Sequence, residues 1–453
     1  MIDLVKEERP TRAVLVGLNT GKTESDFDRS MAELKDLVKA IDITCALTVT
    51  QSLASPDRST YIGSGKVEEI AASLDTFDID LIVFNDALSP MQTRNLEKAL
   101  DTEVIDRTGL ILQIFSRRAR TREATLQVEY AQLQYMLPRL AHMKTSLSRQ
   151  GGGSGRLSNK GSGEKQLELD RRRIEHRMAE LRRNLEDIQK ERDTQRSKRM
   201  RSGIPEVALV GYTNAGKSTI LNGLIDLYGA GEFEEKQVLE KDMLFATLDT
   251  SVRKITPKGR RPFLLTDTVG FISELPHDLV KAFCSTIEEA RYADLLLEIV
   301  DFADPEYRHH MDVTRETLAE IGAGDIPTIF VFNKSDVLKD IQTDKGSLPI
   351  NYPRIYDDRI YISAKEKDSL ENLLDLVEKK LSETENECEM LISYKDGALL
   401  GKLKSMGAVR EMDYHEDGIW VKALLPEKDM AEFTAALKCS TNTLDTIVTS
   451  VQQ

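Results

Sequence analysis

Residues 206–219 read EVALVGYTNAGKST, and this stretch decides the fold of the segment around it. A short apolar run comes before two glycines that are four residues apart, and Lys-Ser follows the second glycine. Beyond the motif, apolar residues recur at helical spacing through residue 227. The sequence therefore predicts a buried strand, a glycine-rich loop and a helix in direct succession, which is the pattern of a phosphate-binding loop.

Each residue type in this loop suits one chemical task. The backbone N–H groups of such a bend, together with the positive end of the next helix, bind phosphate oxygens. Lys217 would reach the β- and γ-phosphates of a nucleotide, and the Ser218 hydroxyl would hold Mg²⁺. We expect nucleotide contacts from the whole loop: Gly211, Tyr212, Thr213, Asn214, Ala215, Gly216, Lys217, Ser218 and Thr219.

Two later segments bear on the triphosphate end of this site. FLLTDTVG (263–270) is an apolar run that ends in D-x-x-G, so Asp267 could hold a Mg²⁺ water and the Gly270 N–H could touch the γ-phosphate. FATLDTS (245–251) offers Thr247 as a sensor of Mg²⁺ and the γ-phosphate, with Thr250 and Ser251 as competitors. The further expected contacts are Phe245, Ala246, Leu248, Asp249, Thr268 and Val269. We expect catalysis from Lys217, Thr247, Asp267 and Gly270, and Mg²⁺ binding by Ser218, Thr247 and Asp267.

The segment TIFVFNKSD (328–336) is expected to recognise the nucleotide base; it is an apolar strand that ends in N-K-x-D. The Asp336 carboxylate can accept hydrogen bonds from guanine N1–H and the 2-amino group, both of which adenine lacks. Asn333 would brace the loop, the Lys334 stem would cover the ring, and the Ala364 N–H would meet guanine O6. The predicted base contacts are Asn333, Lys334, Ser335, Asp336, Ser363, Ala364 and Lys365.

The residue after D-x-x-G points to slow hydrolysis. Many GTPases place a Gln there to orient the attacking water. Here the residue is Phe271, which cannot do so, and no arginine finger is evident in the chain. We expect slow GTP hydrolysis by the protein alone, and acceleration by a partner that completes the site.

The chain of 453 residues has the length of about three domains. Residues 12–110 alternate strand and helix signals, which indicates a small parallel α/β domain. From about residue 111 a helix is expected, then a Gly-rich tip (151–163), then a second helix with an apolar seam. We expect a multidomain α/β protein: an α/β domain (1–110), a helical hairpin (111–202), a Ras-like P-loop GTPase domain (203–382) and a small α+β domain (383–453).

Charge is unevenly distributed along the chain. The net charge is −14, yet residues 111–204 carry 22 Lys/Arg and only 11 Asp/Glu. Such a basic segment is typical of a polyanion-binding surface or of a solvated helix face, and charge alone leaves both open. The tip is either a flexible linker or a positively charged segment that enters a narrow anionic channel. In the second case it would contact RNA through Arg149, Gly151, Gly152, Gly153, Arg156 and Lys160.

Other features narrow the class of protein. No stretch of 18 apolar residues exists, so we expect no membrane span. The start of the chain lacks the pattern of a signal peptide. Four cysteines lie far apart without a CxxC pair, which favours reduced thiols in a cytoplasmic protein. His309-His310 has no nearby Cys and is expected at the surface. We expect a cytoplasmic monomer.

These motifs together resemble the HflX family of translation-associated GTPases. DTVGFISELPHDLVKAFCSTIEEA (267–290), RTGLILQIFSRRARTREATLQVEYAQLQYMLPRL (107–140) and IGSGKVEEI (62–70) carry the resemblance over nearly the whole chain. The resemblance implies a GTP-hydrolysing factor that binds the large ribosomal subunit and splits stalled or idle ribosomes. It implies that the tip lies near the peptidyl-transferase centre, in ribosomal RNA, and that the ribosome is the activating partner.

The chain departs from the family pattern at three places. Its tip is longer and lacks a Pro, Thr250 stands where the family has Pro, and the acidic segment before Phe245 is long. The resemblance also suggests ATP binding at IGSGK (62–66), for which a glycine turn before a helix is the alternative. A rival function is a GTP-locked module that binds ribosomes or ribosomal RNA in anti-association, hibernation or subunit assembly.

Overall fold

The computed structural model describes residues 10–143, 160–229, 251–258, 260–273, 289–338, 352–383, 385–426, 430 and 433. The chain divides into two compact units. The first unit comprises Met1–Gln189, Asp242–Asp249 and Ser273–Ser285, and the second comprises Lys190–Lys241, Thr250–Ile272 and Thr286–Gln453. No described helix is long and apolar enough to cross a membrane.

The first unit is built on a parallel four-stranded sheet with strand order β2-β1-β3-β4. The strands are β1 (Arg12–Asn19), β2 (Thr44–Ser52), β3 (Leu81–Phe84) and β4 (Glu103–Asp106). Side chains of β1, β3 and β4 are mostly buried, as expected for a parallel sheet that is covered on both faces. In the edge strand β2 only Val49 is buried. The predicted parallel α/β domain is confirmed.

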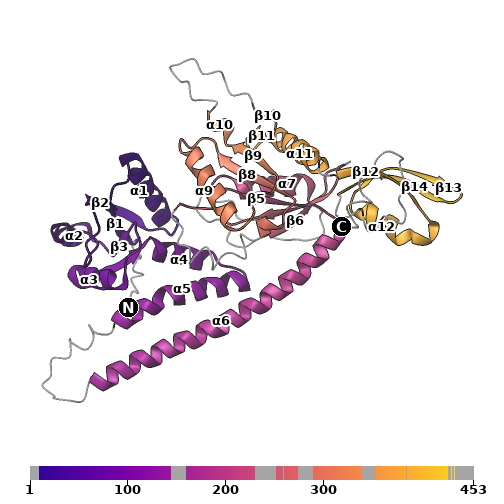
Figure 1. Cartoon of the computed structure of the whole chain (residues 1–453). Helices are drawn as coiled ribbons and strands as arrows, with labels where there is room; N and C mark the ends of the chain where they lie inside the picture. The colour runs from indigo at the N-terminus through magenta and orange to yellow at the C-terminus, as the bar shows by residue number, and fades with distance from the viewer. Residues whose placement is uncertain are drawn as a thin grey trace, which may run out of the picture. The chain divides into compact units, whose positions relative to one another are not determined.

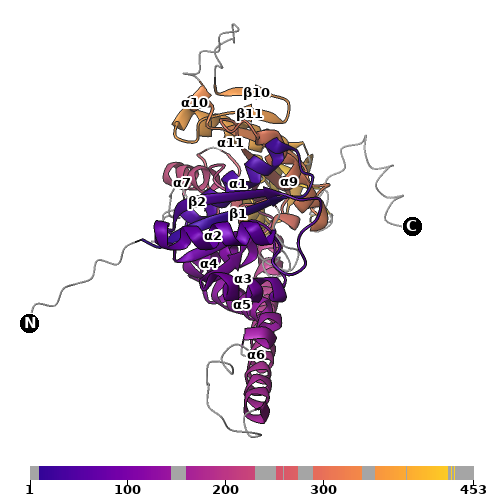
Figure 2. The ribbon, with the colours of Figure 1, turned by 90° about the vertical axis from the view of Figure 1, so that its left-hand side faces the viewer.

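Helices cover both faces of this sheet. They are α1 (Glu24–Lys39), α2 (Ser64–Phe77), α3 (Pro90–Leu100) and α4 (Arg107–Arg118). Val14 and Val16 of β1 share a buried cluster with side chains of α2 and α3. Gly17 points to the other face, where Phe27 and Met31 of α1 leave no space for a side chain. Figure 2 shows α1 and α2 on opposite sides of β1 and β2.

The predicted helical hairpin is present, with one difference in its first arm. The chain forms α4 and then α5 (Arg122–Met143), rather than one helix from about residue 111, because Ala119 is extended with ψ 117°. Helix α6 (Lys160–Ser202) returns antiparallel to α5 (Figure 1). Arg177 of α6 joins Glu129 of α5 by a two-bond ion pair, with distances of 2.7 and 2.9 Å. A charged contact therefore joins the two arms of the hairpin.

The second unit holds a seven-stranded sheet with strand order β10-β11-β9-β8-β5-β7-β6. The strands are β5 (Glu206–Val210), β6 (Ser251–Ile255), β7 (Phe263–Asp267), β8 (Leu295–Asp301), β9 (Thr328–Asn333), β10 (Arg354–Tyr356) and β11 (Arg359–Tyr361). Only the outer pairs β6–β7 and β10–β11 are antiparallel. The parallel strands at the centre end at one edge, which is where ligands of such sheets bind.

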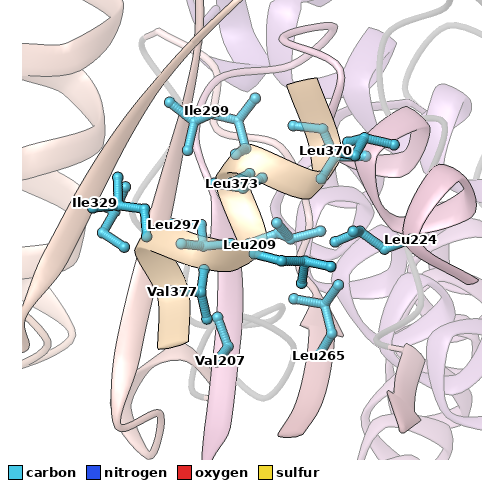
Figure 3. Packing of buried hydrophobic residues seen from close by; sticks show 14 of the residues in the cluster. Val207, Leu209, Leu224, Leu265, Leu297, Ile299, Ile329, Leu370, Leu373 and Val377 are labelled. Atoms are coloured by element: carbon cyan, nitrogen blue, oxygen red, sulfur yellow. The ribbon is translucent and has the colours of Figure 1, made fainter. Parts of the chain in front are cut away.

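A large apolar cluster lies between this sheet and two helices. Side chains of β5, β7, β8 and β9 pack with those of α7 (Lys217–Tyr228) and α11 (Lys367–Ser382), and Figure 3 shows Leu209 in the middle of this cluster. The other described helices of the domain are α9 (Tyr307–Glu320) and the short α10 (Ser335–Leu338). This core holds the strand ends that carry the predicted motifs.

A smaller antiparallel sheet follows the GTPase domain. Its strand order is β12-β14-β13, with β12 (Glu385–Ile392), β13 (Val409–His415) and β14 (Gly418–Pro426). Helix α12 (Gly397–Ser405) lies between β12 and β13 in the sequence and contributes Leu403 to the core of this sheet. The predicted α+β fold is confirmed for these elements. The rest of the predicted domain, residues 427–453 apart from 430 and 433, lies outside the described residues.

Candidate functional site

The glycine-rich loop joins the end of β5 to the start of α7. Gly211 and Gly216 have φ angles of 136° and 98°, which side chains of L residues rarely adopt. A side chain at position 211 would collide with the backbone carbonyl of Ile299, and one at position 216 with the Asn333 amide. The two glycines are therefore needed both for the bend and for its close fit against neighbouring strands.

Lys217 is the first residue of α7, and its amine is folded back onto the loop. Nζ donates to the carbonyls of Gly211 at 2.9 Å and Tyr212 at 2.7 Å. Burial lowers the pKa of Lys217 to about 8, and the nearby Asp267 carboxylate opposes that shift. The amine thus lies inside the loop, as a lysine that binds β- and γ-phosphates must.

Ser218 and Asp267 meet at the carboxyl end of the sheet. The Ser218 hydroxyl donates to Asp267 Oδ2 at 3.0 Å, and Asp267 is fully buried at the end of β7. A hydroxyl and a carboxylate side by side are hard oxygen donors of the kind that Mg²⁺ prefers. These two residues fit a Mg²⁺ that would also bind phosphate oxygens and water.

The D-x-x-G segment lies directly on the phosphate-binding loop. A Cβ atom at Gly270 would be 2.8 Å from Thr213 Cα and 3.1 Å from Lys217 Nζ, so only glycine fits. The Thr213 N–H donates to the Phe271 carbonyl at 2.8 Å, and the Phe271 N–H donates to the Gly211 carbonyl at 3.2 Å. Two backbone hydrogen bonds therefore join the loop to the residue that follows D-x-x-G.

Asn333 links the loop to both base-recognition motifs. Its side-chain Nδ2 donates to the Ala215 carbonyl at 2.9 Å, and its Oδ1 accepts the Ala364 N–H at 2.9 Å. The sequence assigns that N–H to guanine O6, whereas here it is bonded to Asn333. Ser363, Ala364 and Asn333 are nevertheless all buried, and the bond between Ala364 and Asn333 holds the segment around Ala364 next to the N-K-x-D motif.

A second contact fixes the loop that carries the base-selecting aspartate. Lys334 has a φ angle of 62°, and its amine lies 2.7 Å from Asp301 Oδ2 at the end of β8. Ser335 is buried, with its N–H donated to the Ile362 carbonyl at 3.1 Å. These contacts leave Asp336, the first residue after Ser335, partly exposed at the predicted base position.

The structure adds two residues that the motif search missed. Asp301 ends the apolar run of β8, and a carboxylate at the carboxyl end of a central parallel strand is a signal that could have found it. His310 of α9 stacks on Tyr212 of the loop, with ring centroids 3.9 Å apart and planes inclined by 12°. No sequence pattern relates these two rings, because they are about 100 residues apart.

Several predicted residues cannot be placed. Phe245, Ala246, Thr247, Leu248 and Asp249 lie outside the described residues, as do Thr250 and the tip residues Arg149, Gly151, Gly152, Gly153 and Arg156. Lys160 is described only as the first residue of α6. Within the described part of the chain, no group of three His, Cys, Asp or Glu side chains could hold a metal, and Cys45 and Cys388 are free thiols.

Comparison with known protein families gives three matches in series. Residues 28–116 match the model of a GTP-binding GTPase N-terminal region, and residues 118–199 match the corresponding middle region. Residues 206–334 match a model described as a 50S ribosome-binding GTPase. The three matches together cover most of the chain.

Comparison with individual proteins extends over nearly the full length. The chain is 42% identical to a GTPase HflX of Lacrimispora saccharolytica over 94% of this chain and 97% of that protein. It is 38% identical to GTPase HflX of Escherichia coli over 87% of this chain and 89% of that protein. Among solved structures, a GDP complex of a GTP-binding protein from Sulfolobus solfataricus aligns at 25% identity, a TM-score of 0.41, and 82% and 99% coverage.

Proposed function

The chain belongs to the HflX family of GTPases, and from that premise we propose that it is a ribosome-splitting factor whose GTP hydrolysis is stimulated by the large ribosomal subunit. Binding and hydrolysis of GTP follow from the family itself. One observation carries the finer proposal: a family described as 50S ribosome-binding matches the same residues that form the nucleotide site. We propose that the protein acts as a cytoplasmic monomer.

The proposed site uses the residues that the fold brings together. The loop from Gly211 to Ser218 would bind the phosphates, and the Lys217 amine, which lies inside the loop on the carbonyls of Gly211 and Tyr212, would bind the β- and γ-phosphates. Mg²⁺ held by Ser218 and Asp267 would neutralise charge on the β- and γ-phosphate oxygens. Asp336 and Asn333 would select guanine. Thr247, as the third Mg²⁺ and γ-phosphate contact, is part of the same proposal.

Slow hydrolysis without a partner is supported by the position of Phe271. Its side chain is 5% exposed, and both of its backbone polar groups are bonded to the phosphate-binding loop. An apolar ring in this place cannot orient an attacking water, as a Gln does in other GTPases. We propose that the ribosome provides the missing group or reshapes this segment.

The tip of the hairpin is the proposed contact with ribosomal RNA. Residues 144–163 carry four Lys/Arg and no Asp/Glu, whereas residues 164–189 carry seven of each sign. On α6, Arg171, Arg172 and Arg173 are paired with acidic residues of the same helix. The excess positive charge at this end of the hairpin thus belongs to the tip, which supports RNA binding there rather than along the helix.

Sedimentation of ribosomes in sucrose gradients tests the proposal. Intact 70S particles would be mixed with the protein and GTP, a non-hydrolysable analogue or GDP. We expect subunits with either triphosphate and monosomes with GDP. Co-sedimentation with unsplit monosomes in all three cases would instead support the rival function, a binding module that GTP merely locks in one shape.

A further inference from the structure

Thr213 contacts the nucleotide site through its backbone, and its hydroxyl takes part in none of the contacts that fix the phosphate-binding loop. Thr213 is the third residue of the phosphate-binding loop and is only 6% exposed. Its N–H is bonded to Phe271, and its Cα and Cγ2 atoms are the nearest neighbours of the Cβ position of Gly270. Lys217 Nζ is the next neighbour of that position. The side chain therefore lies where the loop, the D-x-x-G segment and the lysine amine meet.

The hydroxyl oxygen of Thr213 is buried without a hydrogen-bond partner in the part of the chain that the structure describes. Two other buried threonines of this domain do have a partner. The Thr268 hydroxyl donates to the Leu209 carbonyl at 2.6 Å, and the Thr314 hydroxyl donates to the His310 carbonyl at 2.8 Å. A buried hydroxyl without a partner costs free energy, so its presence in this loop calls for a partner that arrives with the ligand.

We propose that Thr213 is a catalytic residue, and that its hydroxyl donates a hydrogen bond to the γ-phosphoryl group during hydrolysis. The inference rests on the proposed placement of the triphosphate beside Lys217 and Gly270. A Cβ atom at Gly270 would lie 3.1 Å from Lys217 Nζ and 2.8 Å from Thr213 Cγ2, so the side chain of Thr213 adjoins both residues that are expected to contact the γ-phosphate. A hydroxyl in this place can do part of the work that Phe271 cannot.

The chemistry needs no further reactant. The oxygen of water forms a bond to the γ-phosphorus, and the bond from that phosphorus to the β–γ bridging oxygen breaks. The electron pair of the broken bond stays with GDP, and the proton of the attacking water ends on the released phosphate. Charge accumulates on the transferring group, where a fixed donor stabilises the transition state more than the ground state. Thr213 is unchanged at the end of the step.

Two substitutions separate the hydroxyl from the shape of the side chain. Thr213→Val removes the hydroxyl and keeps the branched shape, and Thr213→Ser keeps the hydroxyl. Thr314→Val is the matched control, because it removes a buried hydroxyl that already has a partner in the same domain. Each full-length protein would be assayed for single-turnover GTP hydrolysis, affinity for fluorescent GDP, and thermal stability.

The expected pattern is specific to a catalytic hydroxyl. Thr213→Val should slow hydrolysis by about 100-fold, the effect of removing one donor to a developing oxyanion. Its GDP affinity should remain unchanged and its melting temperature should not fall, since removal of an unsatisfied hydroxyl is neutral or stabilising. Thr213→Ser should hydrolyse GTP at close to the rate of the unmodified chain. Thr314→Val should melt at lower temperature yet hydrolyse GTP normally.

Three results would overturn the proposal. The first is normal hydrolysis by Thr213→Val, and the second is equal slowing in Thr213→Ser and Thr213→Val. The third is a matched loss of GDP affinity and hydrolysis in Thr213→Val, which would make the hydroxyl a structural part of the loop. A failure of the unmodified chain to bind GTP would contradict the nucleotide site itself, so the two failures are distinguishable.

Discussion

An ion pair between Lys334 and Asp301 fixes the loop that carries the base-selecting Asp336. Lys334 lies at a φ angle of 62°, and the carboxylate of Asp301 fixes its amine at 2.7 Å. Both side chains are mostly shielded from solvent, at 29% and 20% exposure. The pair should therefore stabilise the loop that presents Asp336 by more than a fully exposed pair would.

Asp301→Asn should accelerate release of GDP. The amide can still accept the N–H of Ala303, which donates to Asp301 Oδ1 at 3.1 Å, so the turn after β8 is preserved while the ion pair is lost. We expect about three- to tenfold faster dissociation, equivalent to about 1 kcal/mol. Stopped-flow displacement of a fluorescent GDP measures the rate. Asp312→Asn, on an exposed pair with Arg315, is the control, and equal rates in all three proteins would show that Asp301 is not a positioning residue.

Glu298 gives the GTPase domain a pH dependence of stability. This side chain of β8 is 4% exposed, and burial raises its pKa to about 7, while Arg315 lowers it and Asp312 raises it further. The folded state therefore holds a proton that the unfolded chain releases near pH 4.5. Its contribution to stability is complete below pH 4.5 and is lost as pH rises to about 7.

Glu298→Gln should abolish this pH dependence, because the amide has a similar shape and carries no charge at any pH. The variant should be more stable than the unmodified chain at pH 8, by about 1–3 kcal/mol, with a smaller difference at pH 5. Calorimetric melting at several pH values measures the difference. Glu316→Gln, an exposed residue of α9, should show no such trend. A difference that is constant from pH 5 to pH 8 would contradict the assigned titration.

At the scale of elements, the sequence was sufficient where signals are local. The strand, loop and helix around Gly211–Ser218 follow from an apolar run, two glycines and helical spacing within residues 206–227. The break between α4 and α5 was missed because Ala119–Thr121 contains neither Gly nor Pro, whereas Pro138 lies inside α5 without ending it. The contact of Lys334 with Asp301 was missed because it joins the ends of adjacent strands, which no local pattern encodes.

The last turns of α6 are tied to the GTPase domain by buried charge. Arg196 and Arg199 donate to the two carboxylate oxygens of Glu289, at 3.2 and 3.0 Å, and Glu289 is 5% exposed. Arg199 also lies 3.4 Å from Glu206 at the start of β5. Glu289 follows the D-x-x-G motif by 19 residues in the chain, and Glu206 begins the strand that leads into the phosphate-binding loop. These contacts therefore join the last turns of α6 to β5 and to Glu289.

Glu289→Gln should uncouple ribosome binding from hydrolysis. It leaves two buried guanidinium groups without their shared counter-charge, a change that commonly costs about 3–5 kcal/mol. We expect hydrolysis without ribosomes to stay within about twofold and stimulation by ribosomes to fall at least about tenfold. Circular dichroism would check that the variant is folded. Glu175→Gln, in an exposed pair with Arg171 on the same helix, is the control. Full stimulation of a folded Glu289→Gln protein would exclude this route.

At the scale of the whole molecule, the proposed partner, the ribosome, is a polyanion like this acidic protein. The net charge of −14 opposes their approach, so the proposed binding to RNA has to depend on a local excess of positive charge. Such an excess exists in residues 144–163, which contain four cations and no Asp or Glu. When these side chains bind phosphates they release counterions, so the affinity for RNA falls as the salt concentration rises. The slope of log affinity against log salt is proportional to the number of phosphates that are neutralised.

Two triple variants with the same change of charge test whether the tip provides these contacts. The first replaces Arg149, Arg156 and Lys160 by Ala, and the second replaces Arg171, Arg172 and Arg173, which are already paired with acidic residues of α6. Affinity for 50S subunits would be measured at several salt concentrations. The tip variant should lower the slope of log affinity against log salt by about 2–3, and the helix variant by less than about 1. Because both variants lose three cations, a general effect of net charge would lower the two slopes equally, and that result would move the RNA contact away from the tip.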